Sequence, residues 1–260
     1  MSLRNKINGL VACLKFDNGL QLIADRTFFR KSRFVPYRLN GVDLLADQMG
    51  GDECGLRPCL VEGMYDPFLE AAGAFRKTKP LNVVDLGANA GGFSLIFATR
   101  SIAVKKIVAV EMNPLTYSRM RLNLLTAYGP QACPINAAVG GKSGTVSVPF
   151  SFGGTGDTVS STEEFCGFRV PALTFDEVLE VNFPGETIDI VKMDIEGSEW
   201  EVIDSQARMR LRDCSALIVE IHERSARSVA EFVAAMAEQE LHLSDVRNPR
   251  EKDVYCFFRK

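Results

Sequence analysis

Two polar blocks in the sequence carry side chains that suit ligand binding, and the first is a glycine-rich turn. An apolar run over residues 81–86 contains one acid, Asp85, and leads into the turn at residues 87–91, after which residues 93–98 are mostly apolar. A strand, a tight turn and a helix start form the layout of a nucleotide-type pocket at the carboxyl edge of a parallel sheet. A dinucleotide fingerprint needs glycine where this chain has Asn89, so the turn would accommodate a pyrophosphate poorly.

The turn instead offers groups for an amino-acid moiety. The Asp85 carboxylate suits an ammonium, and the backbone amides of the turn suit a carboxylate. A second apolar run ends at Glu111, about twenty residues after the turn, where an acid grips a ribose diol. A ligand that joins an amino-acid group to a nucleoside is S-adenosylmethionine. A ligand-free turn is the alternative, but we predict a cofactor site with the following residues: Asp85, Gly87, Asn89, Gly91 and Glu111, with Asn136 and Ala137 near the adenine.

The second polar block follows two later apolar runs. The first of these runs, residues 188–193, is followed directly by Asp194 and then by Glu196 and Glu199. The second, residues 216–221, is followed directly by His222. A sulfonium donor needs alignment more than activation, but a hydroxyl acceptor must also lose its proton to a base or near a metal. We therefore expect Asp194, Glu196 and His222 to be catalytic, with His222 as the base or Asp194 assisting. A polar strand end is the structural alternative for His222. We predict no metal site from the sequence, although a cluster of acids such as this one could bind Mg²⁺.

The elements that must position these residues alternate between strand and helix, which implies parallel strands with right-handed crossovers. We predict strands at 81–85, 107–111, 133–139, 188–193 and 216–221, and helices at 69–76, 92–100, 114–127, 199–207 and 225–239. A final strand pair, 241–246 and 253–258, fits an antiparallel edge hairpin. Capping boxes are predicted at Thr174 with Glu177 and at Ser198 with Glu201.

Two segments depart from the alternation. Residues 142–172 interrupt it with two short strands, at 145–150 and 168–172, and a Gly/Ser/Thr loop at 151–161, so we expect this insertion to form part of the acceptor pocket or its lid. Residues 11–24 contain an Asp-Asn-Gly turn between apolar runs, which predicts a β-hairpin. The stretch from 26 to 60 shows no readable pattern.

Composition limits the function classes. The chain has 260 residues, 46% of them hydrophobic, and a net charge of −3. This is enough to bury a large core, and the charge gives no pull toward nucleic acid. No apolar run is long enough to span a bilayer. Seven scattered cysteines do not form a disulfide framework, so we expect a cytoplasmic protein with reduced thiols. Whether it forms an oligomer is left open.

Taken together, the blocks resemble those of the FkbM-type S-adenosylmethionine-dependent methyltransferases over roughly residues 62–222. The Lys-x-Asp-x-Glu-Gly-x-Glu block at 192–199 and the Asp-x-Gly-Ala-Asn block at 85–89 carry most of the likeness. Further similar blocks lie at residues 108–114, 136–140, 160–161, 170–178 and 219–222. The segment at 64–67 is similar to the Tyr-Glu-Pro segment of the family, with Asp66 replacing Glu. The resemblance adds Tyr65, Ala88, Met112 and Asp194 to the predicted cofactor site.

The resemblance implies an α/β fold of the Rossmann-like class I methyltransferase type, with a mostly parallel seven-stranded sheet and a C-terminal antiparallel hairpin. We expect an N-terminal extension with a β-hairpin at 1–60 and the methyltransferase domain at 61–260. The implied activity is O-methylation of a small molecule, a sugar or polyketide-type product. Two alternatives stand: a non-catalytic S-adenosylmethionine-binding or partner subunit, and a methyltransferase for a macromolecule. Asn113-Pro114-Leu115 does not match the N-P-P-Y motif of nucleic-acid amino methyltransferases.

Overall fold

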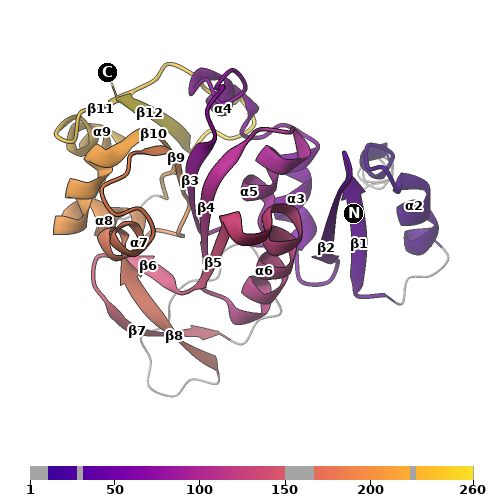
Figure 1. The fold of residues 1–260 in the computed structure, drawn as a ribbon. Helices are drawn as coiled ribbons and strands as arrows, with labels where there is room; N and C mark the ends of the chain where they lie inside the picture. Colours follow the sequence, from indigo (N-terminus) through magenta and orange to yellow (C-terminus); the bar gives the residue numbers. More distant parts are fainter. Residues whose placement is uncertain (1–10, 28–31, 150–166, 223–226, 260) are drawn as a thin grey trace.

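A seven-stranded sheet forms the centre of the computed structural model, which describes residues 11–27, 32–149, 167–222 and 227–259 (Figure 1). The strand order is β11-β12-β10-β9-β3-β4-β5. Five neighbouring strands are parallel, and β12 runs antiparallel to both β10 and β11, which confirms the predicted fold class and its C-terminal hairpin. The strand bounds are β3 Leu81–Leu86, β4 Val104–Glu111, β5 Ala132–Asn136, β9 Ile188–Met193, β10 Cys214–Glu220, β11 Leu241–Leu243 and β12 Val254–Arg259.

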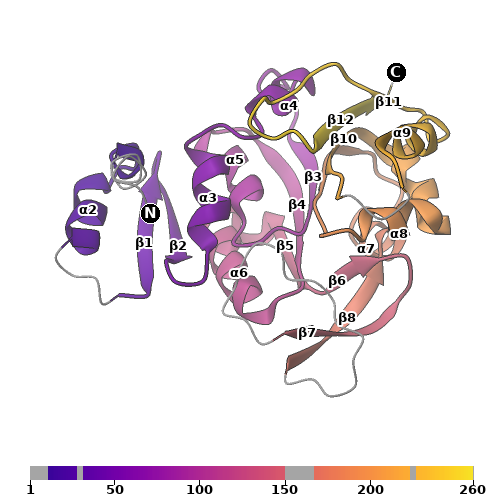
Figure 2. The ribbon, with the colours of Figure 1, turned by 180° about the vertical axis from the view of Figure 1, so that it is seen from behind.

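Helices cover both faces of the sheet (Figures 1 and 2). One face carries α3 (Asp52–Leu60), α5 (Gly92–Thr99) and α6 (Pro114–Tyr128), and the other carries α7 (Phe175–Asn182), α8 (Glu199–Asp204) and α9 (Val229–Ala237). Successive strand residues point to opposite faces. Val83 accordingly belongs to the hydrophobic cluster that includes α5 and α6, and Val84 to the cluster that includes α7, α8 and α9. The carboxyl ends of β3, β4, β9 and β10 meet at one edge.

A smaller sheet interrupts this alternation after β5. It consists of β6 (Ala138–Gly140), β8 (Gly167–Thr174) and β7 (Gly144–Pro149), in that spatial order. The strand predicted at 133–139 is therefore two strands in two sheets. The chain leaves the large sheet at Ala137, whose N–H donates to the Glu111 carbonyl. The strands predicted at 145–150 and 168–172 are confirmed in their described parts, whereas the predicted loop at 151–161 lies outside the described residues.

The N-terminal hairpin exists at other residues than predicted. It pairs β1 (Phe34–Leu39) with β2 (Val42–Asp47) through a turn at Asn40-Gly41, both with positive φ, as a tight hairpin turn requires. The hairpin predicted at 11–24 is wrong, because residues 19–27 form helix α2 (Gly19–Thr27). The polar residues before α2 serve tertiary contacts instead: Asp17 accepts from the Gly41 N–H, and Asn18 bonds to the backbone of β1.

Two buried polar contacts fasten this N-terminal part to α6. Arg119 of α6 donates to both carboxylate oxygens of Asp52, at 2.6 and 2.7 Å. Asn123, also on α6, bonds to both backbone groups of Leu45 and donates to the Ala90 carbonyl in the turn after β3. One hydrophobic cluster runs across residue 60, so the domain boundary there stays a prediction.

Helix ends show how well local sequence signals hold. The Thr174–Glu177 capping box is confirmed at the start of α7. The box predicted at Ser198 is wrong, because the Ser198 side chain makes no capping bond; Glu199 accepts from the Ile195 N–H and closes this loop instead. Helix α8 ends at Asp204, and a 3-10 helix, Gln206–Asp213, follows. The helix predicted at 69–76 is α4, Asp66–Ala71. Among the described residues, no helix is long and apolar enough to cross a membrane.

Candidate functional site

The turn after β3 and the loop after β9 are in direct backbone contact. The Asp194 N–H donates to the Leu86 carbonyl at 3.1 Å. Gly87 has φ +72°, and a Cβ atom there would lie 1.7 Å from the Asp194 carbonyl oxygen. Only glycine tolerates both the left-handed backbone and this approach. The two sequence blocks that carry polar residues are thus brought together at one point of the sheet edge.

Lys192, near the end of β9, also bonds to the turn after β3 and so strengthens the contact between this turn and the loop after β9. Its side chain is buried, and Nζ donates to the carbonyl oxygens of Gly87 at 2.7 Å and Leu86 at 3.3 Å. Nζ also lies 3.3 Å from Asp194 Oδ2 and 3.6 Å from Asp85 Oδ1. Although burial favours the neutral amine, the two carboxylates raise the pKa of Lys192 above its usual value. Lys192 therefore stays a cation that holds the turn and both acids.

Asp85 has surroundings that differ from those expected. Its side chain has no exposed surface, and Oδ2 accepts a 2.7 Å hydrogen bond from Ser94 Oγ. Burial raises the pKa of Asp85, while Lys192 and Ser94 oppose that shift. The ammonium that Asp85 faces in this structure is that of Lys192, so the carboxylate supports the turn from inside.

The backbone amides of the turn are also engaged within the protein. Gly87 and Ala88 donate to the Val110 carbonyl, Asn89 donates to Glu111 Oε2, and Gly91 donates to the Ala88 carbonyl. The N–H of residue 90 donates to the Asn89 side chain. The expectation that these amides are free for a ligand carboxylate is therefore wrong. A turn this tight brings its own acceptors within reach of its donors.

Glu111 ends β4 beside the turn and is nine-tenths buried. Oε2 accepts from the Asn89 N–H at 2.9 Å, and Oε1 accepts from the Asn113 N–H at 2.7 Å. Asn136, at the end of β5, donates to the carbonyls of Glu111 and Met112 at 2.8 and 3.0 Å. Glu111, Met112, Asn136 and the adjoining Ala137 thus lie together, as predicted for a nucleoside site.

Tyr65, which the resemblance places in the cofactor site, packs against the helix that follows the turn. The residue precedes α4, and its buried ring packs edge-on against Phe93 of α5, with 5.0 Å between ring centroids. The neighbouring Asp66 pairs with Arg100 at 2.7 Å. The segment from 64 to 67 therefore supports the helix that follows the turn.

His222 lies at the centre of a carboxylate cluster after β9 and β10. Nδ1 is 3.1 Å from Oε1 of the fully buried Glu199. Nε2 is 3.4 Å from Glu196, 3.8 Å from Glu220 and 3.9 Å from Asp194. The His222 side chain is 28% exposed, so the cluster is open to solvent on one side. The structure therefore brings together the predicted residues Asp194, Glu196 and His222.

These contacts set the protonation of the cluster. The hydrogen bond to Glu199 and the nearby carboxylates raise the pKa of His222 to about 9. Burial and the charge of Asp194 raise the pKa of Glu220 to about 7. At neutral pH the imidazole is therefore protonated and cannot accept a proton, while Glu220 is close to half ionised.

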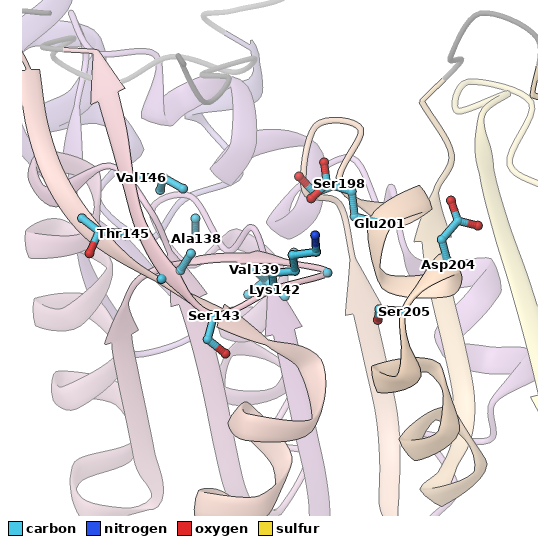
Figure 3. A pocket seen from close by; sticks show the side chains of 14 residues that line it. Ala138, Val139, Lys142, Ser143, Thr145, Val146, Ser198, Glu201, Asp204 and Ser205 are labelled. Atoms are coloured by element: carbon cyan, nitrogen blue, oxygen red, sulfur yellow. The ribbon is translucent and has the colours of Figure 1, made fainter. Parts of the chain in front are cut away.

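A cavity of about 630 Å³ lies between the small sheet and α8. Figure 3 shows Thr145 and Val146 on one side, Glu201, Asp204 and Ser205 on the other, and Lys142 between them. Gly141 approaches the backbone of Glu201, because a Cβ atom on Gly141 would lie 2.8 Å from the Glu201 carbonyl oxygen; a Cβ atom on Gly140 would lie 3.0 Å from the Glu201 side-chain oxygen Oε2. The floor of the cavity is thus fixed by backbone, and hydroxyl, carboxylate and ammonium groups line its walls.

Sequence reasoning missed Glu220, Glu199 and the cavity. Glu220 could have been found, because residues two apart on a strand point to the same face and Glu220 is two residues before His222. From the sequence, Glu199 is explained as an acid in the first turn of a helix, where it complements the helix dipole. The sequence does not show that its side chain points inward to His222. The cavity depends on how the insertion packs against α8, which local patterns do not encode.

Comparisons with known proteins agree with this geometry. The Methyltransferase FkbM domain family matches residues 85–242, more than half of the chain. No curated protein matches. The structure is similar to that of Methyltransferase FkbM from Methylobacillus flagellatus KT, with 16% identity and a TM-score of 0.52 over 75% of this chain and 47% of that chain. It is also similar to a SAM-dependent methyltransferase from Agrobacterium tumefaciens, with 13% identity and a TM-score of 0.46 over 88% of this chain and 71% of that chain.

The first of these solved structures shares the fold, although the present chain spans less than half its length. The strand order of the large sheet, with its antiparallel β12, is that of a class I methyltransferase. The chain therefore belongs to the FkbM methyltransferase family.

Proposed function

We propose that this enzyme methylates a hydroxyl group of a small polar acceptor, such as a sugar or a polyketide-type product. The observation that carries the proposal is the cluster of Asp194, Glu196, Glu220 and His222, which lies where the loop after β9 touches the turn after β3. A hydroxyl must lose its proton when it is methylated, and this cluster supplies proton acceptors at the carboxyl edge of the sheet, where ligands bind in this class of fold.

The cofactor half of the site follows from the turn and from the ends of β4 and β5. In this proposal Glu111 accepts hydrogen bonds from the ribose hydroxyls, and Met112, Asn136 and Ala137 border the adenine. The turn with Gly87, Ala88, Asn89 and Gly91 shapes the amino-acid end, and Tyr65 supports α5 behind it. Asp85 and Lys192 act indirectly, because both are buried: Lys192 donates to the Gly87 carbonyl, and Asp85 pairs with Lys192 and accepts from Ser94 of α5.

The chemical step is an in-line displacement. S-Adenosylmethionine supplies a methyl group on a sulfonium, and its carbon–sulfur bond breaks to leave a neutral thioether. The acceptor oxygen forms the new carbon–oxygen bond, and its proton passes to a carboxylate of the cluster. The enzyme mainly holds the oxygen in line with the methyl group, which is how most of the barrier is lowered when the donor is already activated.

Glu220 is a better proton acceptor than His222 in this arrangement. A general base is most effective when its pKa lies near the working pH, and the pKa of Glu220 is raised to about 7. His222, with a pKa of about 9, enters the reaction already protonated. We therefore assign the base to Glu220 and give Asp194 and His222 the role of setting its charge and position.

The cavity beside α8 fits the acceptor. It is built partly from the insertion at 142–172, which was expected to shape the acceptor pocket. A volume of about 630 Å³ is within the range of small-molecule sites. The residues that line it include four with hydroxyl side chains, Ser143, Thr145, Ser198 and Ser205, which gives the cavity a polar wall. Hydrogen exchange of residues 142–149 should slow when an acceptor and S-adenosylhomocysteine are both bound.

The test is a screen of sugars and polyketide glycosides for a methylated product, with the methylated atom located by NMR. For an accepted substrate, Glu220→Gln should lower kcat by about 10²- to 10⁴-fold, the usual contribution of a general base, and leave cofactor affinity nearly unchanged. The matched control is Glu251→Gln, which removes another part-buried carboxylate whose pKa is raised. A methyl group on nitrogen or carbon, or full activity in the Glu220 variant, would overturn the proposal.

A further inference from the structure

The side chains around His222 form a set of metal ligands that the methyl-transfer proposal does not use as such. The ligand atoms of Asp194, Glu220 and His222 all lie within 4.8 Å of one another, and each side chain is partly exposed. We propose that these three residues bind one divalent transition-metal cation, through a carboxylate oxygen of Asp194 and of Glu220 and through Nε2 of His222.

Glu199 is what distinguishes this group from a surface cluster of acids. Its side chain is fully buried, and Oε1 bonds both to the His222 Nδ1 and to the Ile195 N–H. Metal-binding histidines usually donate their second ring N–H to a carboxylate in this way, which orients the ring and leaves the other nitrogen for the metal. The second oxygen, Oε2, is buried with no hydrogen-bond partner among the described residues. Glu199 therefore holds the His222 ring from the side away from the proposed metal.

The charge balance favours a cation at Nε2. Four carboxylates surround His222, those of Asp194, Glu196, Glu199 and Glu220. Lys192 also contacts this group of carboxylates, on Asp194 Oδ2. Oδ1 of the same carboxylate faces Nε2 instead. A divalent ion between Nε2 and the oxygens would compensate the remaining negative charge, as a single proton cannot.

The distances allow this with small movements. Ligand atoms about 2.1 Å from one ion, at angles of roughly 90° to 120°, are about 3 to 3.6 Å apart. Nε2 is 3.9 Å from Asp194 Oδ1 and 3.8 Å from Glu220 Oε1, so the set needs to contract by less than an ångström or so. The Asp194 backbone is held by Leu86, and the His222 ring is held by Glu199, so the ligands are largely in place.

The ligand types point to the class of metal. Imidazole suits first-row transition metals, and carboxylates suit Mn²⁺ and Mg²⁺. Mg²⁺ prefers oxygen atoms and keeps much of its water, so a site with one imidazole and two carboxylates should prefer Mn²⁺ or Zn²⁺ to Mg²⁺. This inference rests on the same side chains as the proposed function: with a cation bound, Glu220 would be one of its ligands, and the cation would lower the pKa of a bound acceptor hydroxyl in place of a base. The binding itself does not depend on that function.

The experiment measures binding directly. The full chain is freed of metal with chelator and titrated with Mn²⁺, and free Mn²⁺ is followed by electron paramagnetic resonance. We expect one Mn²⁺ per chain and displacement by Zn²⁺ more readily than by Mg²⁺. Asp194→Asn and Glu220→Gln should each weaken binding by at least about tenfold, and Glu199→Gln should weaken it by about 10- to 100-fold. Glu251→Gln, outside the cluster, should bind Mn²⁺ as the parent does.

Thermal unfolding separates metal binding from loss of fold. The same concentration of Mn²⁺ should raise the Tm of the parent chain and of Glu251→Gln more than that of Asp194→Asn. The metal-free Asp194→Asn chain should be folded, because the buried Lys192 keeps Asp85 and the Gly87 carbonyl as partners. No Mn²⁺ binding by the parent chain, or equal binding by the cluster variants, would refute the site. Neither result depends on an acceptor, so the metal site and hydroxyl methylation can fail separately.

Discussion

Replacing Gly87 with alanine should disrupt the contact between the two loops of the site, and its cost can be worked out from the backbone. The residue has φ +72°, a conformation that costs an alanine about 1–2 kcal/mol. A Cβ atom would also lie 1.7 Å from the Asp194 carbonyl oxygen, which is far inside van der Waals contact and cannot be relieved by turning a side chain. Overpacking of this kind typically costs about 1–3 kcal/mol. We therefore expect Gly87→Ala to lower the free energy of unfolding by about 2–5 kcal/mol.

Gly73→Ala is a matched control, because Gly73 has φ +70° and a Cβ atom added there would have no other atom within 4 Å. Gly73→Ala should lower the free energy of unfolding only by the cost of placing alanine in a left-handed backbone conformation, about 1–2 kcal/mol. Urea denaturation of both variants gives the two free energies. Their difference isolates the contact with Asp194. If the two variants unfold at the same urea concentration with the same slope, the close packing of the turn against the loop after β9 is not a constraint, and the coupling that we describe is wrong.

Two further predictions concern the acids at the sheet edge. Glu111→Ala should weaken S-adenosylmethionine binding by about 10- to 100-fold in calorimetric titration, since charge-assisted hydrogen bonds contribute roughly 1.5–3 kcal/mol; unchanged affinity in the folded variant would remove Glu111 from the site. The stability that His222 contributes should be complete below pH 6.5 and lost as the pH rises through about 9, because its pKa is raised in the folded state. Urea unfolding in chelator across this range should show the loss, and His222→Gln should flatten it; an equal slope in both would contradict the surroundings that we describe.

The fold was largely predictable because its signals are local and repeated. Each core strand is an apolar run, and the residue types at its end mark the carboxyl edge, so Glu111 and Asp194 could be placed from the sequence. The two predictions for the N-terminal segment depended on turn signals of similar strength. Asp17-Asn18-Gly19 indicated a hairpin but precedes α2, whereas Asn40-Gly41, which was not recognised, forms the real hairpin turn between alternating strands. A turn signal alone does not reveal what its side chains bond to.

The site was predictable as a group of residues but not as a network. The sequence places Asp194 and His222 at the ends of adjacent strands, yet the pKa of about 9 for His222 arises from Glu199, whose inward direction is set by the loop at Glu196 and Gly197, both with positive φ. Likewise, Asp85 was expected to face a ligand. It faces Lys192, because β3 and β9 are neighbours in the sheet and place the two side chains together.

Lys192 connects the two halves of the reaction physically. The turn after β3 and the loop after β9, which we propose hold the cofactor and the proton acceptors, follow different strands, and a methyl transfer requires that donor and acceptor be aligned within a fraction of an ångström. One buried ammonium bonds to the backbone of the turn at Gly87 and to the side chain of Asp194, while Gly87 itself leaves no room for the loop to move closer. The distance between the cofactor turn and the carboxylate cluster is therefore fixed by buried contacts rather than by the exposed loops around them. Acceptor specificity can then vary in the insertion and the cavity beside α8 without disturbing the alignment on which the chemistry depends.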